Sequence, residues 1–99
     1  MPLRRHEIES ALRHLAPLIP AHEFGAVIDH ALDSAGLKTA SADAAARLSL
    51  VAYVRHVFTD YDALLSQGYD RDSARHFVAD DIATVLKAWG ARRGLGADD

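Results

Sequence analysis

The sequence predicts an all-α protein, a compact four-helix domain organised around a long central helix at about residues 43–67. Apolar residues recur at i, i+3, i+4 and i+7 spacing in four separate stretches, which is typical of one buried helix face. Alanine is abundant and strand-preferring runs are few, which also favours helix. The connections between the stretches are short, as in a compact helical domain.

The first helix is predicted at residues 3–15, where one apolar stripe consists of Ile8, Ala11, Leu12 and Leu15. Pro17 ends this helix because its ring removes a backbone donor and crowds the preceding turn. Pro20 then suits the first position of a second helix, where the missing N–H would be unpaired in any case. We expect Gly36 to close that second helix as a left-handed residue in a Schellman-type ending.

A short linker, residues 38–42, leads to the central helix, and Ser41 is its predicted N-cap. Large residues line one side of this helix: Leu50, Val54, Val57, Tyr61 and Leu65, flanked by Val51, Phe58 and Leu64. Smaller residues line the opposite side: Ala45, Ser49, Ala52, His56 and Ala63. This pattern predicts burial between partners on both faces, with another helix of the chain or a second copy in a homodimer on the small side.

The segment from Thr59 to Asp62 resembles a capping box, at which a helix could restart. We nevertheless expect one continuous helix, because the apolar stripe stays in phase across this point. Gly68 ends the central helix, and Asp70 or Asp72 caps the last one, which runs to Ala88 or Trp89. The buried face of the last helix is predicted to contain Ala74, Phe77, Val78, Ile82, Val85 and Trp89.

Composition narrows the classes of function. The chain has no cysteine, which excludes disulfides, thiolate metal sites and thiol catalysis. No apolar run is long enough for a membrane span and no secretory signal is evident, so a cytoplasmic protein without a membrane partner is expected. The formal net charge of -3 counts against a general coat for nucleic acid. We predict one domain over residues 1–93 and a disordered acidic tail over residues 94–99.

One polar cluster stands out in the second half of the chain. His56 precedes Asp60 by one helical turn, so a carboxylate could orient its imidazole. Arg71 and Arg75 fall beside the apolar stripe of the last helix, where an isolated charge would be costly, so they are predicted to pair with Asp60 and Asp62. The candidate binding site is His56, Thr59, Tyr61, Asp62, Arg71 and Arg75.

Three interpretations of this cluster remain open: a structural ion-pair network, a pocket for an anionic ligand or phosphate backbone, and a catalytic His–Asp pair. No nucleophile elbow, P-loop or H-E-x-x-H motif is present, so no catalytic residue and no cofactor are predicted. The six histidines lack metal-ligand spacing, since His22 and His30 lie about 80° apart around a helix, and no metal site is predicted. Trp89 falls on the apolar stripe and is expected in the core rather than in a base-stacking surface.

The segment from residue 51 to residue 89 resembles a family of domains of unknown function from bacterial and fungal proteins. The residues that carry the resemblance are Arg55, His56, Thr59, Tyr61, Asp62, Leu64, Leu65, Gly68, Arg71, Ala74, Arg75 and Trp89. With the upstream proline-containing segment, the resemblance covers most of residues 15–89. Members of that family often carry a basic, glycine-rich stretch where this chain has only residues 36–42, which weakens a nucleic-acid function. The resemblance supports the fold and marks the polar cluster, and it implies no activity.

The sequence therefore predicts a non-catalytic binding or interaction module whose partner is a protein or an anionic ligand. The alternatives are a small enzyme that uses His56 with Asp60 or Asp62 as a general base, and a domain that contacts nucleic acid.

Overall fold

The computed structural model describes residues 3–92. Its elements are α1 (Leu3–Leu15), α2 (Ala21–Asp33), a 3-10 helix (Ala35–Leu37), α3 (Ala42–Phe58), α4 (Tyr61–Ser66) and α5 (Arg71–Ala88). The all-α prediction is confirmed, since the described residues contain no strand. None of the helices in this part of the chain is long and apolar enough to cross a membrane. The predicted acidic tail, residues 94–99, lies outside the described residues.

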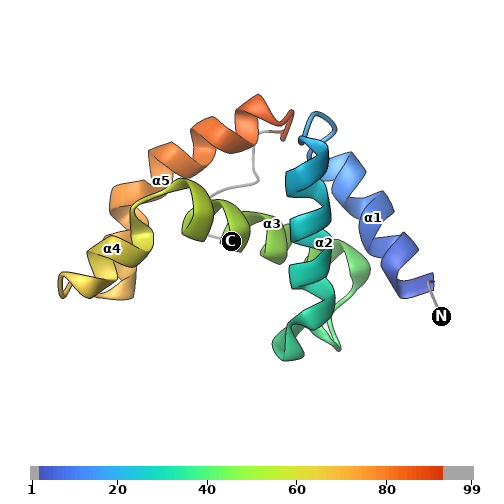
Figure 1. Cartoon of the computed structure of the whole chain (residues 1–99), viewed down its shortest axis with the longest axis horizontal. Helices are drawn as coiled ribbons and strands as arrows, with labels where there is room; N and C mark the ends of the chain where they lie inside the picture. The colour runs from blue at the N-terminus through green and yellow to red at the C-terminus, as the bar shows by residue number, and fades with distance from the viewer. Residues whose placement is uncertain (1–2, 93–99) are drawn as a thin grey trace.

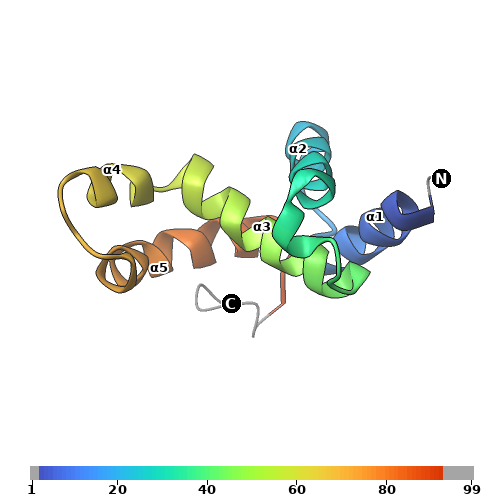
Figure 2. The same cartoon turned by 90° about the horizontal axis from the view of Figure 1, so that it is seen from below.

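Helix α3 is the central helix of the fold, and the other helices pack around its two ends. Helices α1 and α2 contact one end of α3, and α4 and α5 contact the other (Figures 1 and 2). The molecule is elongated, with extents of 42 × 28 × 23 Å along its principal axes. The hydrophobic core lies along α3 and includes Ile8, Leu12, Val27, Ile28, Ala45, Ala46, Leu50, Val51, Val54, Ala74, Val78, Ile82 and Leu86. A central helix covered by the others is therefore confirmed.

The helix starts follow the predicted capping chemistry. The Ser41 hydroxyl accepts the backbone N–H of Ala44 at 3.1 Å, and the Asp70 carboxylate accepts that of Ser73 at 2.8 Å. Each bond satisfies a donor that has no partner within its own helix. Pro20 precedes α2 as its N-cap rather than occupying its first residue, a difference of one position.

Two helix ends use glycine in the left-handed region, where residues with a Cβ are strained. Gly68, with φ +101, closes α4, and Gly90, with φ +84, closes α5. At the second of these ends the N–H of Ala91 donates to Leu86 O at 2.9 Å, which completes a Schellman motif. The prediction of such an ending at Gly36 is wrong, because α2 stops at Asp33 and Gly36 lies inside the 3-10 helix without a positive φ.

The prediction of one continuous helix over residues 43–67 is also wrong. Helix α3 ends at Phe58, Thr59 is extended with φ -134 and ψ 172, and α4 starts at Tyr61, so the chain has five α-helices within the described residues rather than four. The Thr59 hydroxyl donates to the carbonyl oxygen of Arg55 and accepts the N–H of Tyr61 at 3.2 Å. A short polar side chain that bonds its own backbone in this way offers an alternative to helical hydrogen bonds.

Three apolar residues predicted on buried helix faces, Val57, Phe58 and Phe77, are exposed instead, and Phe58, the last residue of α3, is 42% exposed. Val57 is 56% exposed because it lies in the last turn of α3, just before the chain changes direction. Phe77 is 58% exposed, since the buried face of α5 follows Ala74, Val78, Ile82 and Leu86 at four-residue spacing. Trp89 is buried, as predicted.

Candidate functional site

The predicted polar cluster lies at the junction where α3 ends and α4 begins, against the first turns of α5. His56 and Asp62 meet there across the break at Thr59, and the His56 Nδ1 lies 2.7 Å from Asp62 Oδ1. Both side chains are exposed. The carboxylate that orients the imidazole is therefore Asp62, six residues on, rather than Asp60, one helical turn on.

Tyr61 is the buried centre of this junction, with only 4% of its surface exposed. The His56 ring meets the Tyr61 ring edge-on, with 5.3 Å between the ring centroids. From within the junction, the guanidinium carbon of Arg55 lies 5.5 Å from the centre of the Tyr61 ring. This distance is within the range of a cation–π interaction. Tyr61 thus joins the exposed His–Asp pair to a buried cation.

Arg55 is the most unusual residue of the cluster, and the candidate site predicted from the sequence omits it. Only 6% of the surface of Arg55 is exposed. Burial, and then the positive charge of Arg75, lower the pKa of Arg55 from its ordinary value. The sequence did hold a signal, because Arg55 follows the buried Val51 by one helical turn and so shares its face.

Arg75 reaches the same junction from α5. Its Nε is buried and has no hydrogen-bond partner among the described residues. The predicted ion pairs of Arg71 and Arg75 with Asp60 and Asp62 are wrong within that part of the chain, because Asp62 pairs with His56 and neither arginine has a carboxylate within ion-pair distance. Arg71 is exposed at the first residue of α5. The junction therefore brings Arg75 close to Arg55, while Arg71 stays at its edge.

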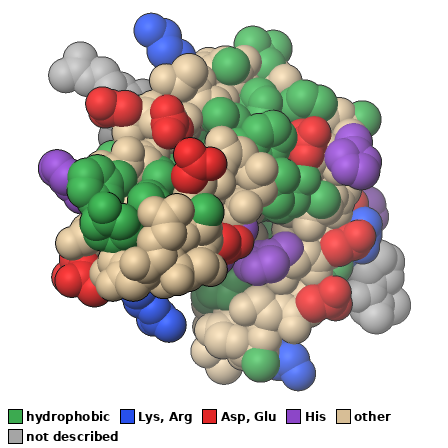
Figure 3. Space-filling view, turned by 60° about the vertical axis from the view of Figure 1, so that its left-hand side comes forward, with side chains coloured by type: hydrophobic (Ala, Val, Ile, Leu, Met, Phe, Trp, Pro, Cys, Tyr) green, Lys and Arg blue, Asp and Glu red, His purple; other side chains and the backbone are tan. Residues whose placement is uncertain are grey.

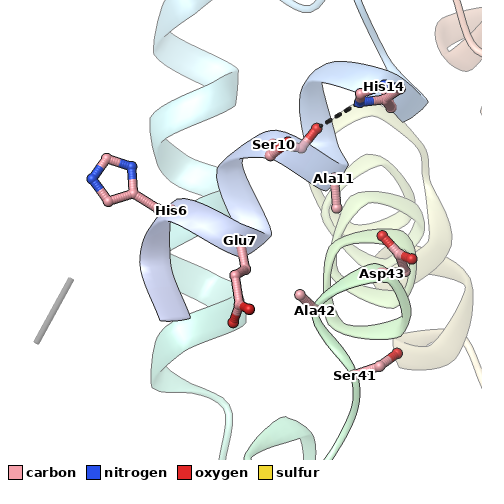
Figure 4. Close-up of a pocket in the computed structure, with 8 residues that line it drawn as sticks. All are labelled: His6, Glu7, Ser10, Ala11, His14, Ser41, Ala42 and Asp43. Atoms are coloured by element: carbon pink, nitrogen blue, oxygen red, sulfur yellow. Dashed lines mark hydrogen bonds between the residues drawn. The ribbon is translucent and has the colours of Figure 1, made fainter. Parts of the chain in front are cut away.

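A shallow hollow of about 580 Å³ lies elsewhere, between α1 and the start of α3. Its lining residues are His6, Glu7, Ser10, Ala11, His14, Ser41, Ala42 and Asp43. Figure 4 shows His6 turned away from α3, while His14 Nδ1 is bonded to Ser10 O at 3.1 Å. Across residues 3–92, no group of three or more metal-ligating side chains could hold a metal ion.

These features define a small all-helical domain with a partly buried cationic junction beside an exposed His–Asp pair. The chain belongs to DUF2293, a family of uncharacterised conserved proteins, whose sequence model matches residues 11–90. This match includes α2 to α5 and agrees with the resemblance to a domain of unknown function. No curated protein matches the chain, and no solved structure matches it either.

Proposed function

We propose that this protein is a non-catalytic binding module and that the junction of α3, α4 and α5 receives an anionic group of its ligand or partner. The observation that carries the proposal is the buried Nε of Arg75, which has no hydrogen-bond partner among residues 3–92. A buried donor without an acceptor costs about 1–3 kcal/mol, and an anion that accepts from it would recover this cost.

The charges around Arg75 also support an anionic ligand. Arg75 is close enough to Arg55 for its positive charge to lower the Arg55 pKa, so a negative charge between them would be stabilised by both. Guanidinium groups bind carboxylates and phosphates through parallel N–H bonds, which suits such an anion. Arg71, exposed one turn before Arg75 on α5, is placed to assist at the rim. His56, Thr59, Tyr61 and Asp62 form the wall of the proposed site.

The test uses the full chain and inorganic phosphate at constant ionic strength, with chloride as the reference anion. Phosphate is expected to raise the midpoint of thermal unfolding through preferential binding to the folded state. Arg75→Gln should abolish this rise, whereas the control Arg92→Gln, which removes the same charge from an exposed residue beyond the C-terminal end of α5, should retain it. A rise equal to that given by chloride, or one that survives in Arg75→Gln, would refute the proposal.

Alanine variants of the two arginines separate a binding role from a structural one. Arg75→Ala and Arg71→Ala should lower the free energy of unfolding by no more than about 1 kcal/mol, because neither side chain makes a hydrogen bond or ion pair within the described residues. A much larger loss would assign the arginines to the packing of α5.

A second candidate function rests on the 2.7 Å contact between His56 Nδ1 and Asp62 Oδ1. An imidazole that is held by a carboxylate and exposed to solvent has the arrangement of a general base. If the protein were an enzyme of this kind, hydrolysis of a test ester would be lost in His56→Gln and reduced in Asp62→Asn. Equal rates for the wild type and His56→Gln would remove this candidate.

A further inference from the structure

The N-terminal half of α5 and the turn before it present an exposed surface that is both acidic and aromatic. Phe77 is 58% exposed and Tyr69, in the turn before α5, is 44% exposed. Their rings meet edge to face, with centroids 5.4 Å apart and an angle of 77° between the ring planes. The two rings contact each other, so their exposed areas form one contiguous apolar patch rather than two scattered side chains.

Three carboxylates lie on the same side of α5 as Phe77. At about 100° per residue, Asp80 and Asp81 lie within about 60° of Phe77 around the axis of α5, and Asp70 is the N-cap residue directly before this helix, about two turns from Phe77. All three are exposed. The hydrogen bond from the Ser73 N–H lowers the pKa of Asp70, which favours its charged form. No lysine or arginine among the described residues lies within ion-pair distance of these carboxylates.

We infer that this acidic aromatic face, made of Tyr69, Asp70, Phe77, Asp80 and Asp81, docks a basic segment of a partner protein that also carries apolar side chains. The partner's lysine or arginine groups pair with the three carboxylates, and its apolar side chains cover the two rings. Aromatic residues are frequent anchors of protein interfaces, and a cation over a ring face adds a further attraction. Figure 3, which brings the α4 and α5 end forward, shows hydrophobic and acidic side chains interspersed on one face.

The charges argue against two other occupants of this face. Nucleic acid would bring phosphates against three carboxylates, which repel them. A second copy of the chain in a two-fold contact would place the same acidic residues opposite each other, because such an interface joins identical surfaces. The face lies on the opposite side of α5 from Arg75, so this inference does not depend on the proposed anion site.

The test is a titration of the ¹⁵N-labelled full chain with a synthetic peptide of alternating lysine and leucine, followed by amide spectra. Saturable shifts are expected at residues 69–81. Phe77→Ala, and separately the double variant Asp80→Asn with Asp81→Asn, should weaken binding by about tenfold. The control Val57→Ala truncates an apolar side chain of similar exposure, 56%, on another helix and should bind as the wild type does.

Several outcomes would overturn the inference. These are an absence of shifts, shifts confined to other helices, equal binding by Phe77→Ala, or equal binding of a peptide in which glutamate replaces lysine. Dimerisation of the free chain that is lost in Phe77→Ala would instead identify a second copy as the occupant. Equal binding of a lysine peptide without leucine would reduce the contact to charge alone and would also contradict the proposed docking.

Discussion

Replacing three glycines by alanine tests how the helices end and how α5 is fixed to the rest of the fold. At Gly90 a Cβ would lie 3.1 Å from Pro17 Cγ and 3.2 Å from Leu18 Cγ, in addition to the strain of φ +84. The left-handed conformation costs a residue with a Cβ about 1–2 kcal/mol, and crowding of this kind adds about 1 kcal/mol or more. Gly90→Ala should therefore lower the free energy of unfolding by about 2–3 kcal/mol.

Two other glycines separate strain from crowding. Gly68 has φ +101 but nothing within 4 Å of an added Cβ, so Gly68→Ala should cost only the strain, about 1 kcal/mol after the gain from a stiffer unfolded chain. Gly36 has neither a positive φ nor a close neighbour, so Gly36→Ala should be neutral or slightly stabilising.

Urea denaturation of the three variants beside the wild type measures the differences. The expected order of stability is Gly36→Ala, then Gly68→Ala, then Gly90→Ala. The contact of Gly90 with residues 17 and 18 is reinforced by a 2.9 Å hydrogen bond from the Leu18 N–H to Trp89 O. A Gly90→Ala variant as stable as Gly36→Ala would refute the close docking of the α5 end on the α1–α2 connection.

Three further substitutions test particular contacts. The Ser49 hydroxyl is fully buried without a hydrogen-bond partner among the described residues, so Ser49→Ala should stabilise the fold by up to about 1 kcal/mol; a clear loss in a urea titration would contradict this. Burial, and then the 2.5 Å hydrogen bond to Glu23 and its charge, raise the pKa of Tyr53 to about 12. Because an unfolded tyrosine ionises near about pH 10, the unfolded chain releases its proton first, and stability should fall by about 1 kcal/mol by about pH 11. Tyr53→Phe should not show this part of the loss, and an identical pH profile for both proteins would refute the assignment. Thr59→Ala removes the hydroxyl that accepts the Tyr61 N–H and should cost about 1 kcal/mol, whereas an unchanged midpoint would show that the hydroxyl does not stabilise the break.

The sequence predicted best those features that depend on a few neighbouring atoms. The stop at Pro17, the caps Ser41 and Asp70 and the ending at Gly68 are each decided by one residue and the backbone groups next to it. The same local logic failed at Gly36, because a 3-10 turn satisfies the end of α2 without a left-handed residue.

The break at Thr59 shows why an apolar pattern alone is ambiguous. Two helices that meet at an angle can both turn their apolar sides to one core, so a stripe in phase does not require one straight helix. The competing signal, the capping-box-like segment from Thr59 to Asp62, was present in the sequence. In the structure the chain does break there, and the Thr59 hydroxyl bonds the carbonyl oxygen of Arg55.

The candidate site was predicted only in part, because its contacts depend on the break at Thr59 and on how the helices cover one another. His56 and Asp62 were recognised as members of one cluster, but their direct contact depends on the break that was not expected. The burial of Arg55 and the exposure of Phe77 depend on which helices cover each face, and that is a property of the assembled fold rather than of any one stretch.

The most direct test of the proposed anion site is the side-chain Nε–H resonance of Arg75 in the ¹⁵N-labelled full chain. We expect inorganic phosphate at constant ionic strength to shift this resonance with a saturable dependence, while that of the exposed Arg92 follows only the bulk salt. An Arg75 resonance that stays in place while phosphate is added, or that moves in step with Arg92, would contradict the account.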